Sequence, residues 1–86
     1  MEKKGLEFPC RFPVKTIGRN TGNFEELVVE IVRRHVPDLQ DREISSRLSR
    51  DGKYLSVTTT FIATSQEQLD DLYYELSRNE LVMMVL

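Results

Sequence analysis

The amino-acid sequence predicts an α+β domain with a four-stranded antiparallel sheet and two helices on one face of it. Two segments alternate apolar and polar residues with the period of a strand, and two others repeat apolar residues with the period of an α-helix. The dipeptide Asp51-Gly52 lies between two strand-like segments and favours a tight primed turn that joins antiparallel strands. The signals occur in the order strand, helix, strand, strand, helix, strand.

The first predicted strand follows an extended strap over residues 8–13, which contains two prolines that disfavour regular pairing. From Phe12 onward, the residues alternate between two sides. The side expected to face the core carries Phe12, Val14 and Thr16, and the other side carries Lys15 and Ile17. This pattern is typical of a strand with one buried face.

The first helix is expected to begin after Asn23, whose side chain can cap it, with Glu26 as the capping-box partner. The preceding residues, 18–22, are turn formers. The apolar stripe of this helix consists of Phe24, Leu27, Val28, Ile31 and Val32. Pro37 predicts that the helix ends near His35.

The second and third strands are predicted to form a hairpin around Asp51-Gly52. Residues 39–42 are interpreted as a loop, and residues 44–48 form a short polar strand that is typical of a sheet edge. Residues 54–63 are rich in β-branched side chains and alternate like the first strand. The set expected to face the core is Leu55, Val57, Thr59, Phe61 and Ala63, and the opposite set is Tyr54, Ser56, Thr58, Thr60 and Ile62.

The second helix is expected to begin at Thr64 or Ser65, either of which can cap it. Its apolar stripe consists of Leu69, Leu72, Tyr73 and Leu76. Residues 81–86 are all apolar and form the last predicted strand, but without alternation the sequence leaves open which of its faces is buried. Right-handed crossovers place the first and third strands in the centre, so the predicted fold is the ferredoxin-like βαββαβ two-layer sandwich.

Composition and charge argue against several classes of protein. The chain of 86 residues is expected to form one domain, 1–86, in which residues 1–11 are an extended leader. The formal net charge is −2, so no global positive field attracts nucleic acid or an anionic membrane. The chain has no apolar run that could cross a bilayer and no pattern of a secretory signal, so we expect a cytoplasmic protein.

No catalytic, metal or cofactor site is predicted. The single cysteine, Cys10, and the single histidine, His35, are too few for a metal centre, and an inert thiol is favoured over a reactive one. His35 stands alone at a helix end, where an imidazole favours the helix dipole more simply than it acts as a base. The acidic residues fall mostly on the solvated faces of helices. We therefore expect a protein that is not an enzyme.

Several segments together resemble the YbeD-like family of small bacterial proteins. They are Leu6-Glu7-Phe8-Pro9, Arg34-His35, Gly52-Lys53-Tyr54-Leu55-Ser56-Val57-Thr58, Leu72-Tyr73-Tyr74-Glu75-Leu76 and Val82-Met83-Met84-Val85-Leu86. The resemblance covers residues 6–86 and implies a ferredoxin-like fold similar to the ACT regulatory domains. Family members carry the label of lipoate regulatory proteins, which implies a link with lipoate metabolism, and the family has no established site residues to transfer.

Two surfaces are candidates for binding. Similarity to ACT domains implies a ligand near the loop after the first strand, and free N–H groups at a helix start suit an anion there, although a plain connecting turn is the simpler interpretation. That loop is Gly18, Arg19, Asn20, Thr21, Gly22 and Asn23. The uncovered sheet face is the second candidate, and its predicted interface residues are Ile17, Tyr54, Ile62 and Met83.

Two functions follow from these surfaces. The first is an ACT-like regulatory or adaptor module that forms a homodimer and binds an unknown protein or a small metabolite. The alternative is a weak RNA-binding module that uses Tyr54 and the basic hairpin residues Arg42, Arg47, Arg50 and Lys53. The central strands lack the interleaved aromatic residues on which RNA bases stack, so the pattern argues against nucleic acid as the partner.

Overall fold

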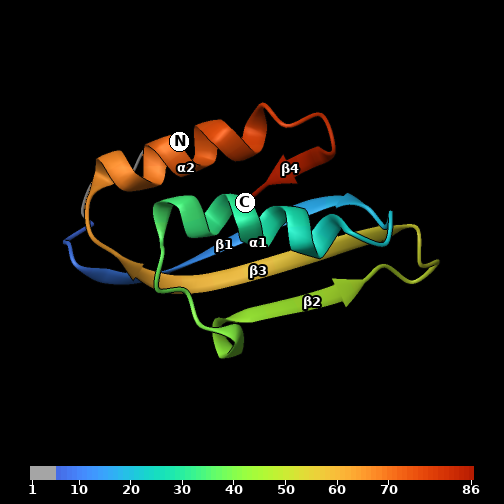
Figure 1. The fold of residues 1–86 in the computed structure, drawn as a ribbon, viewed down its shortest axis with the longest axis horizontal. Coiled ribbons are helices and arrows are strands. Elements are labelled where there is room, and N and C mark those ends of the chain that lie inside the picture. The colour runs from blue at the N-terminus through green and yellow to red at the C-terminus, as the bar shows by residue number, and fades with distance from the viewer. Residues whose placement is uncertain (1–5) are drawn as a thin grey trace.

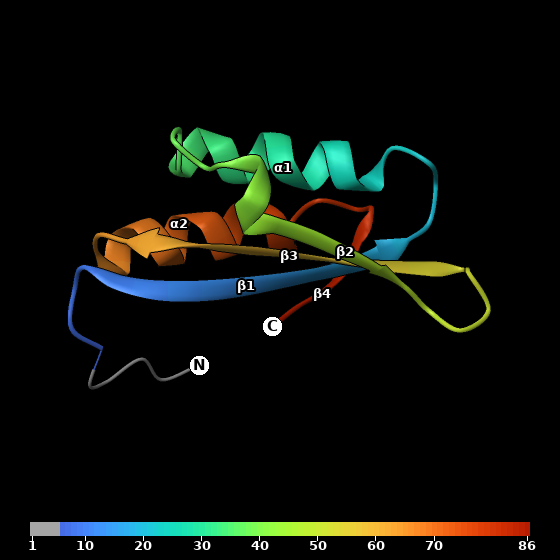
Figure 2. The ribbon, with the colours of Figure 1, turned by 90° about the horizontal axis from the view of Figure 1, so that it is seen from below.

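The computed structural model describes residues 6–86, and its helices and strands follow the predicted order (Figure 1). The elements are β1 (Cys10–Arg19), α1 (Phe24–His35), a 3₁₀ turn (Asp41–Glu43), β2 (Ile44–Leu48), β3 (Tyr54–Ala63), α2 (Gln66–Ser77) and β4 (Val82–Val85). The strands form one antiparallel sheet in the order β2-β3-β1-β4, and both helices lie on the same face of it (Figure 2). The predicted ferredoxin-like sandwich is confirmed.

β1 begins at Cys10, so the interpretation of residues 10–13 as an unpaired strap is wrong. Of the predicted leader, residues 1–5 lie outside the described residues, whereas Cys10 and Arg11 pair with β3. The strand accommodates Pro13 because Lys15 exchanges its backbone hydrogen bonds with Leu86, on the β4 side. Pro13 is two residues earlier and has the same orientation, so its missing N–H points past the end of β4.

The alternation predicted for the two central strands is confirmed. β1 and β3 pair along their whole length, and Val14, Val57 and Phe61 are buried beneath the helices. The helices contribute the other large part of the core, through Phe24, Val28, Ile31 and Val32 of α1 and Leu69, Leu72 and Leu76 of α2. The opposite face of the sheet has no covering layer among residues 6–86, as Figure 2 shows.

The two helices begin differently. Ser65 caps α2 as expected, because its side chain accepts a hydrogen bond from the backbone N of Gln68 at 3.0 Å. The capping box expected at Asn23 is wrong, because the side chain of Asn23 makes no hydrogen bond to the start of α1. Its Oδ1 instead accepts a hydrogen bond from Thr21 Oγ1 at 2.9 Å. The start of α1 therefore depends on tertiary packing rather than on its cap.

The hairpin between β2 and β3 is present, but its turn is not the expected primed type. A type I′ turn needs a positive φ at both of its central residues, here Asp51 and Gly52. Gly52 has a φ of 74°, but no residue other than glycine has a positive φ among residues 6–86, so Asp51 does not meet this requirement. The backbone N of Gly52 donates to Ser49 O at 2.9 Å, and Asp51 accepts hydrogen bonds from the Ser49 hydroxyl and the Lys53 amide. These two donors lower the pKa of Asp51, and the loop is longer than a two-residue turn.

The last strand contains a bulge that decides which of its faces is buried. Val82 pairs with Gly18 and Met84 pairs with Ile17, so Met83 is an extra residue between two neighbouring pairs. Val82 and Val85 both pack against the core, although strict alternation would place them on opposite faces. The residues left outside are Met83, Met84 and Leu86.

Candidate functional site

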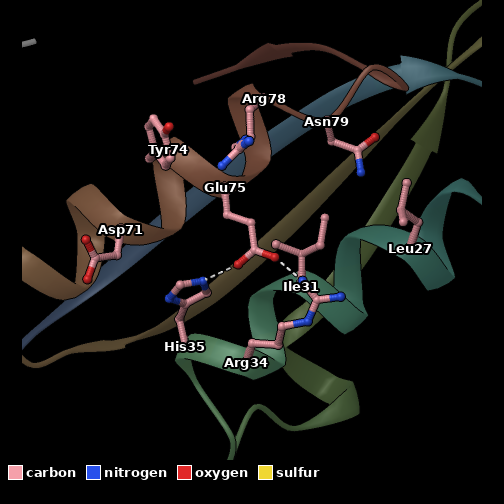
Figure 3. A pocket seen from close by; sticks show the side chains of 9 residues that line it. All are labelled: Leu27, Ile31, Arg34, His35, Asp71, Tyr74, Glu75, Arg78 and Asn79. Carbon is pink, nitrogen blue, oxygen red and sulfur yellow. Dashed lines mark hydrogen bonds and ion pairs between the residues drawn. The ribbon is translucent and has the colours of Figure 1, made fainter.

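The exposed sides of α1 and α2 border an open groove of about 600 Å³ (Figure 3). His35, the last residue of α1, lies in this groove with its Nε2 2.7 Å from Oε1 of Glu75 in α2. Arg34 forms an ion pair with the other oxygen of the same carboxylate. The expectation that His35 stands alone is therefore wrong, because Glu75 is 40 residues away and reaches it only through helix packing.

The environment of Glu75 favours its ionised form. The hydrogen bond with His35 is the main cause that lowers the pKa of this carboxyl from its ordinary value of 4.5. Burial opposes the shift, and the positive charge of Arg34 adds to it. Gln68 strengthens the same contact, because its Nε2 donates to the backbone O of His35 at 2.8 Å. These groups satisfy one another and join the two helices.

The groove contains a base and an orienting acid without an obvious nucleophile. A triad needs a hydroxyl or thiol that the imidazole can deprotonate. Besides His35 and Glu75, the lining residues are Leu27, Ile31, Arg34, Asp71, Tyr74, Arg78 and Asn79. None of them is serine, threonine or cysteine. The one lining residue with a hydroxyl is Tyr74, and the guanidinium carbon of Arg78 lies 5.3 Å from the centre of its ring. The contacts of His35 and Arg34 with Glu75 join α1 to α2.

The predicted ligand loop is shorter than residues 18–23. Gly18 and Arg19 belong to β1, and a Cβ on Gly18 would overlap the ring of Phe24. Asn20 connects the loop to the β2–β3 hairpin, because its backbone N donates to Lys53 O at 2.9 Å and its side chain donates to Gly52 O at 3.1 Å. Gly22 has a φ of 93° and faces open space. Most of these groups serve the local fold, and ligand binding here stays a prediction.

The four predicted interface residues do not form one patch. Ile17 lies opposite Met84 and therefore near Met83, at the β4 side of the sheet. Tyr54 pairs with Arg19, whose guanidinium lies 5.9 Å from the centre of the Tyr54 ring. Ile62 is eight residues further along β3, which is about 26 Å at the rise of a strand. The structure therefore brings Ile17 and Met83 together and leaves Ile62 at the far end.

Sequence reasoning missed the distribution of charge on the uncovered sheet face. The four strands contain no Asp or Glu, and all of their cations lie on this face. These cations are Arg11, Lys15 and Arg19 of β1 and Arg47 of β2. The alternation of residues in the first strand indicates that these cations share one face. The predicted strand covered only residues 12–17, however, and therefore left out Arg11 and Arg19.

Residues 6–86 also offer little of the chemistry that metal binding needs. This part of the chain holds no group of three or more His, Cys, Asp or Glu that could bind a metal ion. Cys10 is half-buried and carries a free thiol. No helix of the described chain has the length and apolar character needed to span a membrane.

The fold and these surfaces define a class of small α+β sandwich with ferredoxin-like topology and one uncovered sheet face. The chain belongs to the DUF493 family, a family of proteins of unknown function whose model matches residues 3–86. The resemblance to YbeD-like bacterial proteins is thereby confirmed. The description of the family names no activity.

Curated relatives share nearly the whole chain. A UPF0250 protein of Nitrosomonas europaea is 42% identical over 85 residues, which covers 99% of this chain and 98% of the relative. A UPF0250 protein of Chromobacterium violaceum is 43% identical over 86 residues and covers 99% and 97% of the two chains. Both are bacterial proteins.

Two solved structures are similar in fold. The solution structure of protein HP0495 from Helicobacter pylori has a TM-score of 0.70 at 12% identity and covers 99% of this chain and 89% of that one. The C-terminal domain of the MgtC protein from Mycobacterium tuberculosis has a TM-score of 0.66 at 21% identity and covers 100% and 89%. At these identities, the likeness concerns the fold alone.

Proposed function

We propose that this protein is a non-catalytic regulatory or adaptor module that associates with other molecules through its uncovered sheet face. The observation that carries the proposal is an exposed apolar surface along the edge strand β4. Met83, Met84 and Leu86, here called the β4 strip, have exposed fractions of 59%, 52% and 59%. Apolar side chains gathered at a sheet edge indicate a contact surface.

The bulge holds the β4 strip on the outside. Because Val82 and Val85 both pack against the core, turning the strand to bury the methionines would expose the two valines instead. Met84 lies opposite Ile17, so the strip continues onto the sheet face. Methionine side chains are flexible and polarizable, which suits a surface that adapts to a partner.

The occupant that we propose for the β4 edge is a second copy of this chain. Among residues 6–86, β4 pairs only with β1, so its other side presents backbone groups that have no strand partner in this part of the chain. Two copies related by a twofold axis can pair β4 with β4, which joins their sheets and brings the two strips together. A small metabolite would then bind at the subunit boundary, as in ACT-like regulation, and the family label makes lipoate metabolism the first setting to examine.

Light scattering over a range of protein concentrations tests this dimer. We expect the wild type to reach the mass of two chains and the Met83→Lys variant to remain at the mass of one, because the new charge would be buried in an apolar contact. Ile62→Lys is the matched control, since it adds the same charge at the far end of β3. A wild type that stays monomeric throughout, or equal effects of the two substitutions, would contradict a contact through β4.

A further inference from the structure

The uncovered sheet face carries positive charge of a single sign. Arg11, Lys15 and Arg19, here called the cationic row, lie four residues apart on β1 and face away from the helices. At the rise of a strand, the row is about 26 Å long. Arg47 of β2 lies on the same face, because it pairs with Ser56, which in turn pairs with Ile17. The row and Arg47 therefore form one cationic surface in a chain of net charge −2.

The cations of this surface have no acidic partner. None of the cationic row or Arg47 forms an ion pair with another residue of the described chain, 6–86. By contrast, Arg33 pairs with Asp41 at 3.1 Å, and Arg34 pairs with Glu30 and Glu75. Protection of a sheet edge explains an arginine on β2, but it does not explain Lys15, which lies on a central strand.

Lys15 and Arg47 both line one shallow depression in the sheet face. The depression has a volume of about 300 Å³ and is also lined by Ser45, Ser46, Ser56 and Thr58. The hydroxyls of Ser45 and Thr58 can donate hydrogen bonds to a ligand, and the two cations add charge-assisted ones. The hydroxyl of Ser46 already donates to Glu25, and that of Ser56 donates to the backbone O of Arg47. The chemistry of this depression suits a carboxylate.

The cationic surface borders the β4 strip. Lys15 exchanges backbone hydrogen bonds with Leu86, and Ile17, two residues along the same face, lies opposite Met84. A partner that lies across β1 would therefore contact cations on one side and apolar side chains on the other. Such a surface is complementary to a polypeptide that carries acidic residues beside apolar ones.

We propose that the uncovered sheet face binds an acidic amphipathic segment of another protein. Its carboxylates contact Lys15 and Arg47, and its apolar side chains contact Ile17 and Met84 on the sheet face, which edge-to-edge pairing of β4 leaves exposed. The proposal deepens the proposed function and rests on it, because it names the partner of the same face. A single-stranded nucleic acid fits this surface less well, because its bases need aromatic side chains on which to stack. Tyr54 is the one aromatic residue that the four strands place on the uncovered face, and its ring already lies against Arg19.

Fluorescence anisotropy with a labelled helical peptide tests the proposal. The probe is an 18-residue peptide with glutamates on one face and leucines on the other, and an 18-nucleotide oligo-uridine RNA is the comparator. We expect the peptide to bind the wild type more tightly than the RNA does, and Lys15→Glu and Arg47→Glu each to weaken the peptide about tenfold. Arg78→Glu makes the same charge change on the helix layer and is expected to have less than a twofold effect.

Three outcomes would overturn the proposal. They are the absence of peptide binding by the wild type, tighter binding of the RNA at the same salt concentration, and equal weakening by Arg78→Glu and Lys15→Glu. Circular dichroism of each variant establishes that it is folded, and Arg47 lies on an exposed edge where a substitution leaves the core intact. The oligomeric state is measured separately, so a failed dimer and a failed peptide site give different results.

Discussion

The helix layer and the uncovered sheet face contain similar charged residues in different surroundings. In the helix layer, Arg34 and His35 share the carboxylate of Glu75, and Arg33 meets Asp41. On the sheet face, Lys15 and Arg47 form no ion pair with another residue of the described chain. Charge that is compensated within the fold joins its elements, whereas charge that is left uncompensated is available to another molecule.

The threonines of the strands show the same contrast. Thr16 and Thr59 face the helices, and their buried hydroxyls have no hydrogen-bond partner among the described residues. Thr58 and Thr60 are on the other side of β3, where solvent can reach them. A polar group therefore costs stability on the covered face, and on the uncovered face it costs little.

The largest expected effect is on the covered face. Phe24→Ala removes a fully buried ring from between α1 and Gly18 of β1, so we expect the free energy of unfolding to fall by about 3–5 kcal/mol. Ile62→Ala, at a position that is 49% exposed on the uncovered face, should change it by about 0.5 kcal/mol. Urea denaturation measures both. Similar losses of unfolding free energy in the two variants would contradict the difference in packing between the covered and the uncovered face of the sheet.

A smaller effect, of opposite sign, is expected at the buried threonines. Thr59→Val replaces an unsatisfied buried hydroxyl by a methyl group, and we expect the free energy of unfolding to rise by about 1 kcal/mol. Thr58→Val is the matched control on the other face and should leave stability nearly unchanged. Thermal unfolding of both variants provides the comparison. A loss of stability in Thr59→Val would mean that its hydroxyl has a partner after all.

The smallest expected effect concerns the contact between the helices. Glu75→Gln should lower the free energy of unfolding by about 0.5–1 kcal/mol at neutral pH, because the contact with His35 and Arg34 loses its negative charge. The folded-state pKa of Glu75 is lowered, so its contribution is present above the ordinary value of 4.5 and is lost as pH falls through the folded-state value.

Urea midpoints measured from neutral pH to about pH 3 test this dependence. The difference between the wild type and Glu75→Gln should shrink as the solution becomes more acidic. Asp71→Asn, a neighbouring position on α2, is the control. A difference that is constant with pH would indicate that the substitution acts through packing and not through the charge.

Local sequence patterns predicted the structure correctly where a pattern is compatible with a single kind of element. The alternation of β1 and β3, the stripe of α1 and the cap at Ser65 were predicted correctly, because each depends on neighbours within a few residues. The failures at Asn23 and Asp51-Gly52 have a common cause. The side-chain oxygens of Asn23 and Asp51 can each accept hydrogen bonds from several nearby donors. In the structure, Asn23 accepts from the hydroxyl of Thr21 and Asp51 accepts from the hydroxyl of Ser49.

The candidate surfaces depended more strongly on distant contacts. An apolar run such as residues 81–86 carries no period, so only the pairing with β1 and its bulge decided that Val82 and Val85 lie inside. The contact of His35 with Glu75 required the two helices to be packed together. The placement of Lys15 and Arg47 on the same face of the sheet required the register of three strands.

The sequence by itself therefore determined the order of the elements and the buried face of the two central strands and both helices, because periodicity and caps act over a few residues. The tertiary structure decided which side chains of the final strand are exposed, which charges are compensated and where cations gather. These properties depend on residues that are distant in the chain and meet only when the sheet and helices are assembled.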